Sequence, residues 1–130
     1  MRPTDKTILL LTSDPDVRNV MQDLLTREGY LVIAEGSLGG AVDRLKDLRP
    51  DLLIIRPYIN SMPGHDAAIY LRTKRPGIPV LMIGGLIDDD RLNHRNELEA
   101  FHIFPKPIPA QQFVDEVRRV LNGPRSFETS

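Results

Sequence analysis

The sequence predicts an α/β domain in which helices cover both faces of a parallel sheet. Short apolar runs alternate five times with segments of helical periodicity, and the run Leu52–Ile55 contains no polar residue. Uninterrupted apolar strands are typical of a sheet that is buried on both faces, and the alternation requires right-handed crossovers between parallel strands. The 130 residues, 41% of them hydrophobic, are enough for one core.

The first strand and helix have clear boundary signals. Thr7–Leu11 is a short apolar run and is expected to form a buried strand. Asp14 is a good N-cap and Pro15 a good first residue for the helix that follows. Gly29 is expected to end this helix, because glycine adopts the left-handed conformation of a helix C-terminus at little cost.

A second strand and helix lead to the central strand. The strand is expected over residues 30–34, and the helix begins at the N-cap Ser37 and stops at Pro50. The central strand is Leu52–Ile55, and its pairing should stop at Arg56, because the next residue is a proline without an N–H. Arg56 therefore stands at the carboxyl end of a parallel strand, where ligands collect in open α/β sheets.

The second half of the chain continues the alternation. Its expected elements are a polar loop over 57–64, a helix over 65–74, a strand over 78–83, a helix over 88–99, a strand over 101–104 and a helix over 110–121. The five strands and five helices are expected to form a doubly wound, flavodoxin-like sheet with the strand order 2-1-3-4-5. The expected domain covers residues 7–121, with flexible tails at 1–6 and 122–130.

The composition argues against several classes of function. With 17 basic and 18 acidic residues, nothing in the charge calls for nucleic acid or a membrane as the main partner. The absence of cysteine removes disulfides, thiol catalysis and thiolate metal sites. No apolar run approaches the ~20 residues of a membrane-spanning helix, and the first six residues lack the apolar segment of a signal peptide. We therefore expect a cytoplasmic protein.

Seven short segments keep a characteristic order and spacing along the chain. They are Ile8–Leu11, Asp14–Arg18, Arg27–Tyr30, Arg49–Ile55, Met62–Gly64, Ile78–Val80 and Lys106-Pro107. Together they resemble the receiver domain of bacterial two-component response regulators, over about residues 7–121. The resemblance implies the flavodoxin-like fold and a role in a phosphorelay.

The resemblance also implies a pocket for phosphoryl transfer from a histidine kinase, and this sequence departs from that pocket. In the family an aspartate at the end of the third strand accepts the phosphoryl group, and two acids after the first strand help to hold Mg²⁺. At these positions the sequence has Arg56 and the pair Thr12 and Ser13. The family's hydroxyl residue after the fourth strand is replaced by Gly84, and only the lysine is kept, as Lys106.

No change of register restores the acceptor, because there is no Asp or Glu from Leu52 through His65. Asp14 is the nearest acid to the end of the first strand, and it is expected to serve as an N-cap. Mg²⁺ prefers charged oxygen ligands, and arginine is not a nucleophile for phosphoryl groups. We therefore expect no Mg²⁺ or other cofactor, no aspartyl phosphate and no enzymatic activity.

Arg56 and Lys106 would repel each other if both pointed into this pocket. In a first arrangement, Asp14 or Asp88 forms an ion pair with Arg56 and locks the pocket in one state. In a second, Arg56 turns out to solvent. In a third, the two cations, the hydroxyls of the pocket and the backbone amides at Gly84 bind a small anion.

The leading hypothesis is a receiver-like module, a pseudo-receiver, that acts through protein contacts independent of phosphorylation. The resemblance places the contact, with a partner protein or in a homodimer, on the face of the fourth helix, the fifth strand and the fifth helix. The candidate residues on this face are Leu92, His94, Arg95, Ile103 and Phe113, with Ile103 in place of the family's switch aromatic. The alternative is a sensor domain that binds an anion or an acidic metabolite at Arg56 and Lys106.

Overall fold

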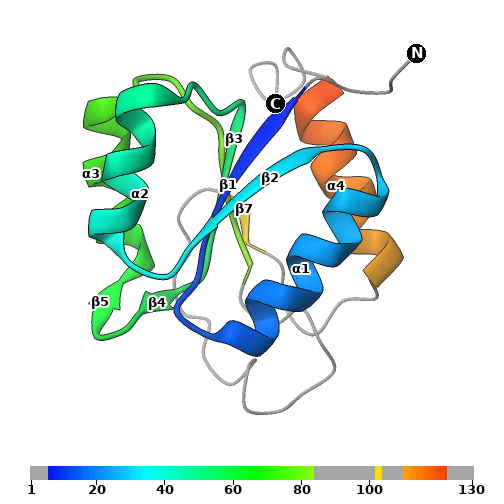
Figure 1. Cartoon of the computed structure of the whole chain (residues 1–130), viewed down its shortest axis with the longest axis horizontal. Helices are drawn as coiled ribbons and strands as arrows, with labels where there is room; N and C mark the ends of the chain where they lie inside the picture. The colour runs from blue at the N-terminus through cyan, green and yellow to red at the C-terminus, as the bar shows by residue number, and fades with distance from the viewer. Residues whose placement is uncertain (1–5, 84–101, 104–109, 123–130) are drawn as a thin grey trace.

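A computed structural model describes residues 6–83, 102–103 and 110–122, and it shows a sheet that lies between two pairs of helices (Figure 1). Along the chain the elements are β1 (Thr7–Leu11), α1 (Pro15–Arg27), β2 (Leu31–Glu35), α2 (Leu38–Asp47), β3 (Leu52–Ile55), β4 (Tyr58–Ile59), β5 (Met62–Pro63), α3 (Gly64–Lys74), β6 (Val80–Met82), β7 (His102–Ile103) and α4 (Ala110–Asn122). The predicted α/β class is confirmed.

The main sheet has five strands in the order β2-β1-β3-β6-β7, and each neighbouring pair is parallel. β6 and β7 are the fourth and fifth strands of this sheet along the chain, so the predicted order 2-1-3-4-5 is correct. All four residues of the central strand β3 are buried, as its uninterrupted apolar sequence predicts.

Each face of the sheet carries its own hydrophobic cluster, because alternate strand residues point to opposite sides. α1 and α4 cover one face, and α2 and α3 cover the other (Figure 1). The first cluster includes Ile8, Leu10, Val17, Met21, Leu25, Leu52, Ile54, Phe113 and Val117. The second includes Leu9, Leu11, Ala41, Leu53, Ile55, Ala67, Ala68 and Leu71.

The helix ends follow the signals that the sequence carries. The Asp14 Oδ1 atom accepts a hydrogen bond from the backbone N–H of Asp16 at 2.9 Å, so Asp14 is the N-cap of α1. In α2 the Ser37 hydroxyl accepts from the N–H of Gly40 at 3.1 Å. Gly29 has φ 97°, the left-handed conformation expected just after the end of α1.

The segment predicted as a polar loop over 57–64 contains a two-stranded hairpin instead. β4 and β5 pair antiparallel, with Ile59 opposite Met62. Asn60 begins the turn with φ 59°, a conformation that asparagine tolerates better than most residues. The buried side chain of Ile59 anchors the hairpin to the core cluster on the α2–α3 face. Strands of two residues carry too short a pattern to be recognised in a sequence.

Two strands begin later than predicted. β2 begins at Leu31, since the N–H of Tyr30 bonds to the carbonyl of Leu25 in α1 rather than to a strand. β6 begins at Val80, since Pro79 has no N–H to donate to a ladder. The helix predicted over 88–99 lies outside the described residues.

Candidate functional site

The candidate site lies at the carboxyl edge of the sheet, where the residues that follow adjacent strands leave the sheet side by side. Leu11 of β1 pairs with Ile55 of β3, so Thr12 and Arg56 leave the sheet next to each other. Ile55 also pairs with Met82 of β6 on the other side. The fold therefore brings together three of the pocket residues predicted from the sequence, Thr12, Ser13 and Arg56.

The hydroxyls of Thr12 and Ser13 both accept backbone hydrogen bonds. Thr12 is 1% exposed, and its Oγ1 atom accepts from the N–H of Asp14 at 3.2 Å. The Oγ atom of Ser13 accepts from the N–H of Asn60 at 3.2 Å and so links the loop after β1 to the β4–β5 hairpin. Each hydroxyl keeps its own O–H available as a donor. These two residues fix the loop after β1 and offer neutral donors rather than charged oxygen ligands.

Arg56 is buried at the end of β3, with 8% of its surface exposed. Burial lowers the pKa of its guanidinium below the usual value, and the negative charge of Asp14 raises it. An arginine side chain keeps its proton in proteins, so this edge of the sheet carries a buried positive charge. The arrangement in which Arg56 turns out to solvent is therefore wrong, because the fold encloses the side chain.

Asp14 is the described acid whose charge acts on Arg56. The same carboxylate caps α1 through Oδ1, so it is held in place by two backbone N–H groups of the first turn. The negative charge of Asp14 therefore opposes part of the cost of burying Arg56. An ion pair that locks the pocket in one state stays a prediction. Asp88, the other acid considered for that pairing, lies outside the described residues.

Gly64 is a residue of this site whose role is not visible in the local sequence pattern. A Cβ atom added at Gly64 would lie 2.0 Å from the carbonyl oxygen of Arg56 and 3.1 Å from that of Pro57. The N–H of Gly64 donates to the Pro57 carbonyl at 2.5 Å. α3 therefore begins directly against the backbone that carries Arg56, which leaves no room for a side chain. The available signal was that Gly64 belongs to Met62–Gly64, one of the segments that carry the resemblance to the receiver family.

Several predicted site residues fall where the structure gives no side chain. Gly84 and Lys106 of the pocket, and Leu92, His94 and Arg95 of the predicted interaction face, lie outside the described residues. The backbone of Ile103 lies in β7, paired with Met82 of β6.

Phe113 was predicted for the interaction face, and that prediction is wrong. Its side chain is 0% exposed and belongs to the core cluster between α4 and the sheet. It lies one turn from the buried Val117 on the inward side of α4, so it packs against the sheet rather than against a partner. The exposed side of α4 is polar and includes Gln111, Gln112 and Arg119.

In the part of the chain that the structure describes, no three His, Cys, Asp or Glu side chains are grouped closely enough to hold a metal ion. No helix in that same part has the length and apolar character needed to cross a membrane.

Comparison with known sequences supports the family that these segments suggest. The family model of the response regulator receiver domain matches residues 8–118. The response regulator protein VraR of Staphylococcus epidermidis is 27% identical over 106 residues, which cover 81% of this chain and 51% of VraR. The chain thus spans about half the length of the curated relatives that it matches.

Solved structures share the fold. The chemotaxis response regulator CheY4 of Vibrio cholerae superposes with a TM-score of 0.71 and 18% identity, over 91% of this chain and 100% of CheY4. The second structure is the receiver domain of the sensor histidine kinase PA1611 from Pseudomonas aeruginosa, solved with a magnesium ion in its active site cleft. It superposes with a TM-score of 0.68 and 18% identity, over 92% of this chain and 99% of the PA1611 domain. The chain therefore belongs to the response regulator receiver domain family of two-component signalling, with a flavodoxin-like fold.

Proposed function

We propose that this receiver domain signals through protein contacts that do not depend on its phosphorylation. The observation that supports the proposal is the buried Arg56 at the end of β3. The resemblance to the family puts the acceptor aspartate at this position. A guanidinium does not act as a nucleophile toward a phosphoryl group, and burial of Arg56 does not change this. The domain would then lack the covalent step that switches an ordinary receiver.

The donor set beside Arg56 does not suit Mg²⁺. Thr12 and Ser13 offer neutral hydroxyls that already accept backbone hydrogen bonds. The one carboxylate described beside them, that of Asp14, caps α1 and compensates the charge of Arg56. Mg²⁺ requires charged oxygen ligands in octahedral geometry, and a buried cation at the same edge repels it. We expect no metal-dependent chemistry and no enzymatic activity at this site.

The surroundings of Arg56 support a pocket that stays in one state. The negative charge of Asp14 opposes the effect of burial on Arg56. The backbone of Arg56 lies close to Gly64, the first residue of α3. A domain fixed in this way would present the same surface at all times. Its activity would depend on which partner is present and at what concentration, rather than on a phosphodonor. Receiver domains do bind partner proteins and dimerise, so a contact is the output that this family offers.

The partner surface that we propose from the family is the one formed by the helix predicted over 88–99, by β7 and by α4. Within α4 the contact would use the exposed polar side chains Gln111, Gln112 and Arg119, since Phe113 is in the core. Direct contact with nucleic acid is not part of this proposal, because the charges of the chain nearly cancel.

Beryllofluoride with Mg²⁺, which mimics an acyl phosphate on an aspartate, tests the proposal. We expect that thermal unfolding and the amide NMR spectrum of the natural chain stay unchanged when both are added. The matched variant is Thr12→Asp/Ser13→Asp/Arg56→Asp, which supplies the missing carboxylates, and a phosphorylatable receiver serves as the positive control. A specific response of the natural chain, with amides at the ends of β1 and β3 shifted, would contradict the proposal.

A second candidate function is the binding of a small anion. The buried charge of Arg56 lies beside two hydroxyls that retain their O–H donors, a combination that suits phosphate or a carboxylate. Lys106 would complete this site. Stabilisation of the chain by inorganic phosphate, lost in Arg56→Met, would favour this function over the first. No shift of the unfolding midpoint with phosphate or with small dicarboxylates would remove it.

A further inference from the structure

Exposed apolar side chains gather on one segment of the described chain. Of the six large hydrophobic side chains that are exposed in the described residues, four lie between β3 and β6: Tyr58 at 51%, Met62 at 36%, Ile69 at 50% and Tyr70 at 45%. Single exposed apolar side chains are normal on a protein surface, whereas a group of them indicates a contact surface. These four belong to the β4–β5 hairpin and to α3, which are adjacent in the fold.

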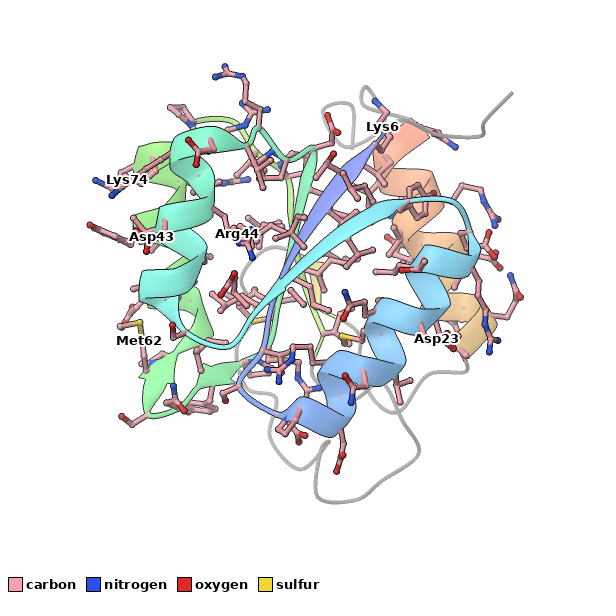
Figure 2. The ribbon with its side chains drawn as sticks, viewed as in Figure 1. Lys6, Asp23, Asp43, Arg44, Met62 and Lys74 are labelled. Atoms are coloured by element: carbon pink, nitrogen blue, oxygen red, sulfur yellow. The ribbon has the colours of Figure 1, made fainter. Side chains whose placement is uncertain are left out.

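The α3 residues of this group share one face of the helix. Asp66, Ile69, Tyr70 and Lys74 are three or four residues apart, so their side chains form a continuous stripe. The opposite side of α3, with Ala67, Ala68 and Leu71, is buried against the sheet. Figure 2 shows Met62 and Lys74 projecting outward on the side of the molecule that carries α2 and α3. We call Tyr58, Met62, Asp66, Ile69, Tyr70 and Lys74 the α3 patch.

The two charges of the α3 patch have opposite signs and lie at opposite ends of its stripe along α3. Asp66 is in the first turn of α3 and Lys74 in the last, and both are exposed. They are eight positions apart in the helix, or about 12 Å along the helix axis. The ammonium of Lys74 lies 5.2 Å from the centre of the Tyr70 ring, which holds the positive charge against the apolar part of the patch.

Such a stripe is complementary to itself. When two copies of α3 lie antiparallel across a two-fold axis near Tyr70, each Asp66 lies opposite the Lys74 of the other copy. The apolar side chains Ile69 and Tyr70 then meet at the centre. A two-fold interface requires this kind of surface, in which residue i contacts j and j contacts i. We propose that the chain forms a two-fold homodimer through the α3 patch.

This dimer would leave the proposed partner surface open. α3 and α4 cover opposite faces of the sheet (Figure 1), so a second copy on α3 does not cover α4. The homodimer could then present two copies of the α4 side to partners at the same time. The inference does not depend on Arg56, and the dimer can fail while the proposed function stands.

Charge reversal at the two ends of the patch tests the dimer. Self-association of the natural chain is measured by sedimentation equilibrium at low salt, and we expect a concentration-dependent dimer. Asp66→Lys alone and Lys74→Glu alone should each weaken it at least tenfold. An equimolar mixture of these two variants should associate again, because each lysine then faces a carboxylate. The double variant Asp66→Lys/Lys74→Glu should also regain the dimer.

Two further variants separate the patch from general surface effects. Ile69→Asp should abolish association, whereas Leu31→Asp, at an equally exposed apolar residue on β2, should leave it unchanged. Thermal unfolding of every variant checks that the fold is kept. The proposal is overturned if the natural chain stays monomeric at every concentration, as it would if this surface served a different protein. It is equally overturned if the mixed variants fail to associate while both remain folded.

Discussion

The negative charge of Asp14 acts on the buried guanidinium of Arg56 at the carboxyl edge of the sheet. Burial lowers the pKa of Arg56, and the charge of Asp14 raises it. Asp14 also caps α1 through the backbone N–H groups of Asp16 and Val17. One side chain therefore couples the start of α1 to the charge at the end of β3, and the two roles can be separated by substitution.

Asp14→Asn keeps the cap, because asparagine is as good an N-cap as aspartate, and removes the charge. We expect it to lower the free energy of unfolding by about 1 kcal/mol, since Arg56 then loses a compensating charge. Asp14→Ala should cost about 1 kcal/mol more, because it also removes the cap. Urea unfolding of these variants measures both effects.

The control for this coupling is the same pair of substitutions in an Arg56→Met background. There Asp14→Asn should be nearly neutral, because no buried charge remains for Asp14 to compensate, while Asp14→Ala keeps the cost of the cap. Equal costs of Asp14→Asn in both backgrounds would show that Asp14 acts as a cap alone.

Gly64 and Gly39 form a matched pair for the contact behind Arg56. A Cβ atom at Gly64 would lie 2.0 Å from the Arg56 carbonyl oxygen, so Gly64→Ala must displace backbone and should destabilise the fold by about 2 kcal/mol. Gly39 lies in α2 with nothing within 4 Å of an added Cβ, so Gly39→Ala should stabilise it by about 0.5 kcal/mol or more. Chemical unfolding measures both, and a stabilising Gly64→Ala would contradict the close contact.

Tyr30 should make stability depend on pH in the alkaline range. Burial raises the pKa of its hydroxyl above the usual value of about 10, with Arg118 opposing this shift and Glu28 reinforcing it. The folded chain then holds the proton to a higher pH than the unfolded chain does. The stabilising contribution is complete below pH of about 10 and is lost as the pH rises through the raised pKa.

Tyr30→Phe removes this titration, so its free energy of unfolding should fall less steeply with pH above about 10. Urea unfolding of both proteins over this range of pH measures the two slopes. Identical slopes would show that Tyr30 titrates alike in the folded and unfolded states.

Much of the fold could be predicted because its signals are local. The apolar runs of β1 and β3, the caps Asp14 and Ser37, and Gly29 all depend on neighbouring residues in the chain, and the structure has them as expected. The β4–β5 hairpin was missed, because two-residue strands carry too short a pattern and the hydrogen bond from Asn60 to Ser13 joins residues far apart in the chain. That contact is invisible in a local pattern.

The site could be predicted in position but not in detail. The order of the strands places Thr12 beside Arg56, as the sequence indicates. Whether Arg56 is buried depends on what surrounds it in three dimensions, so the sequence left three arrangements open. The contact of Gly64 with the Arg56 backbone likewise arises only when α3 packs against the sheet. Phe113 shows a further difficulty, since an apolar residue on an amphipathic helix can serve a core or an interface, and here it serves the core.

Intact mass spectrometry after treatment with acetyl phosphate and Mg²⁺ tests the central claim most directly. The natural chain should keep its mass, because in the proposed function Arg56 stands in place of the acceptor carboxylate. Thr12→Asp/Ser13→Asp/Arg56→Asp, which rebuilds the carboxylates, and a phosphorylatable receiver are treated in parallel. A natural chain that gains the mass of one phosphoryl group, released by hydroxylamine as an acyl phosphate and absent in Asp14→Asn, would contradict a phosphorylation-independent receiver.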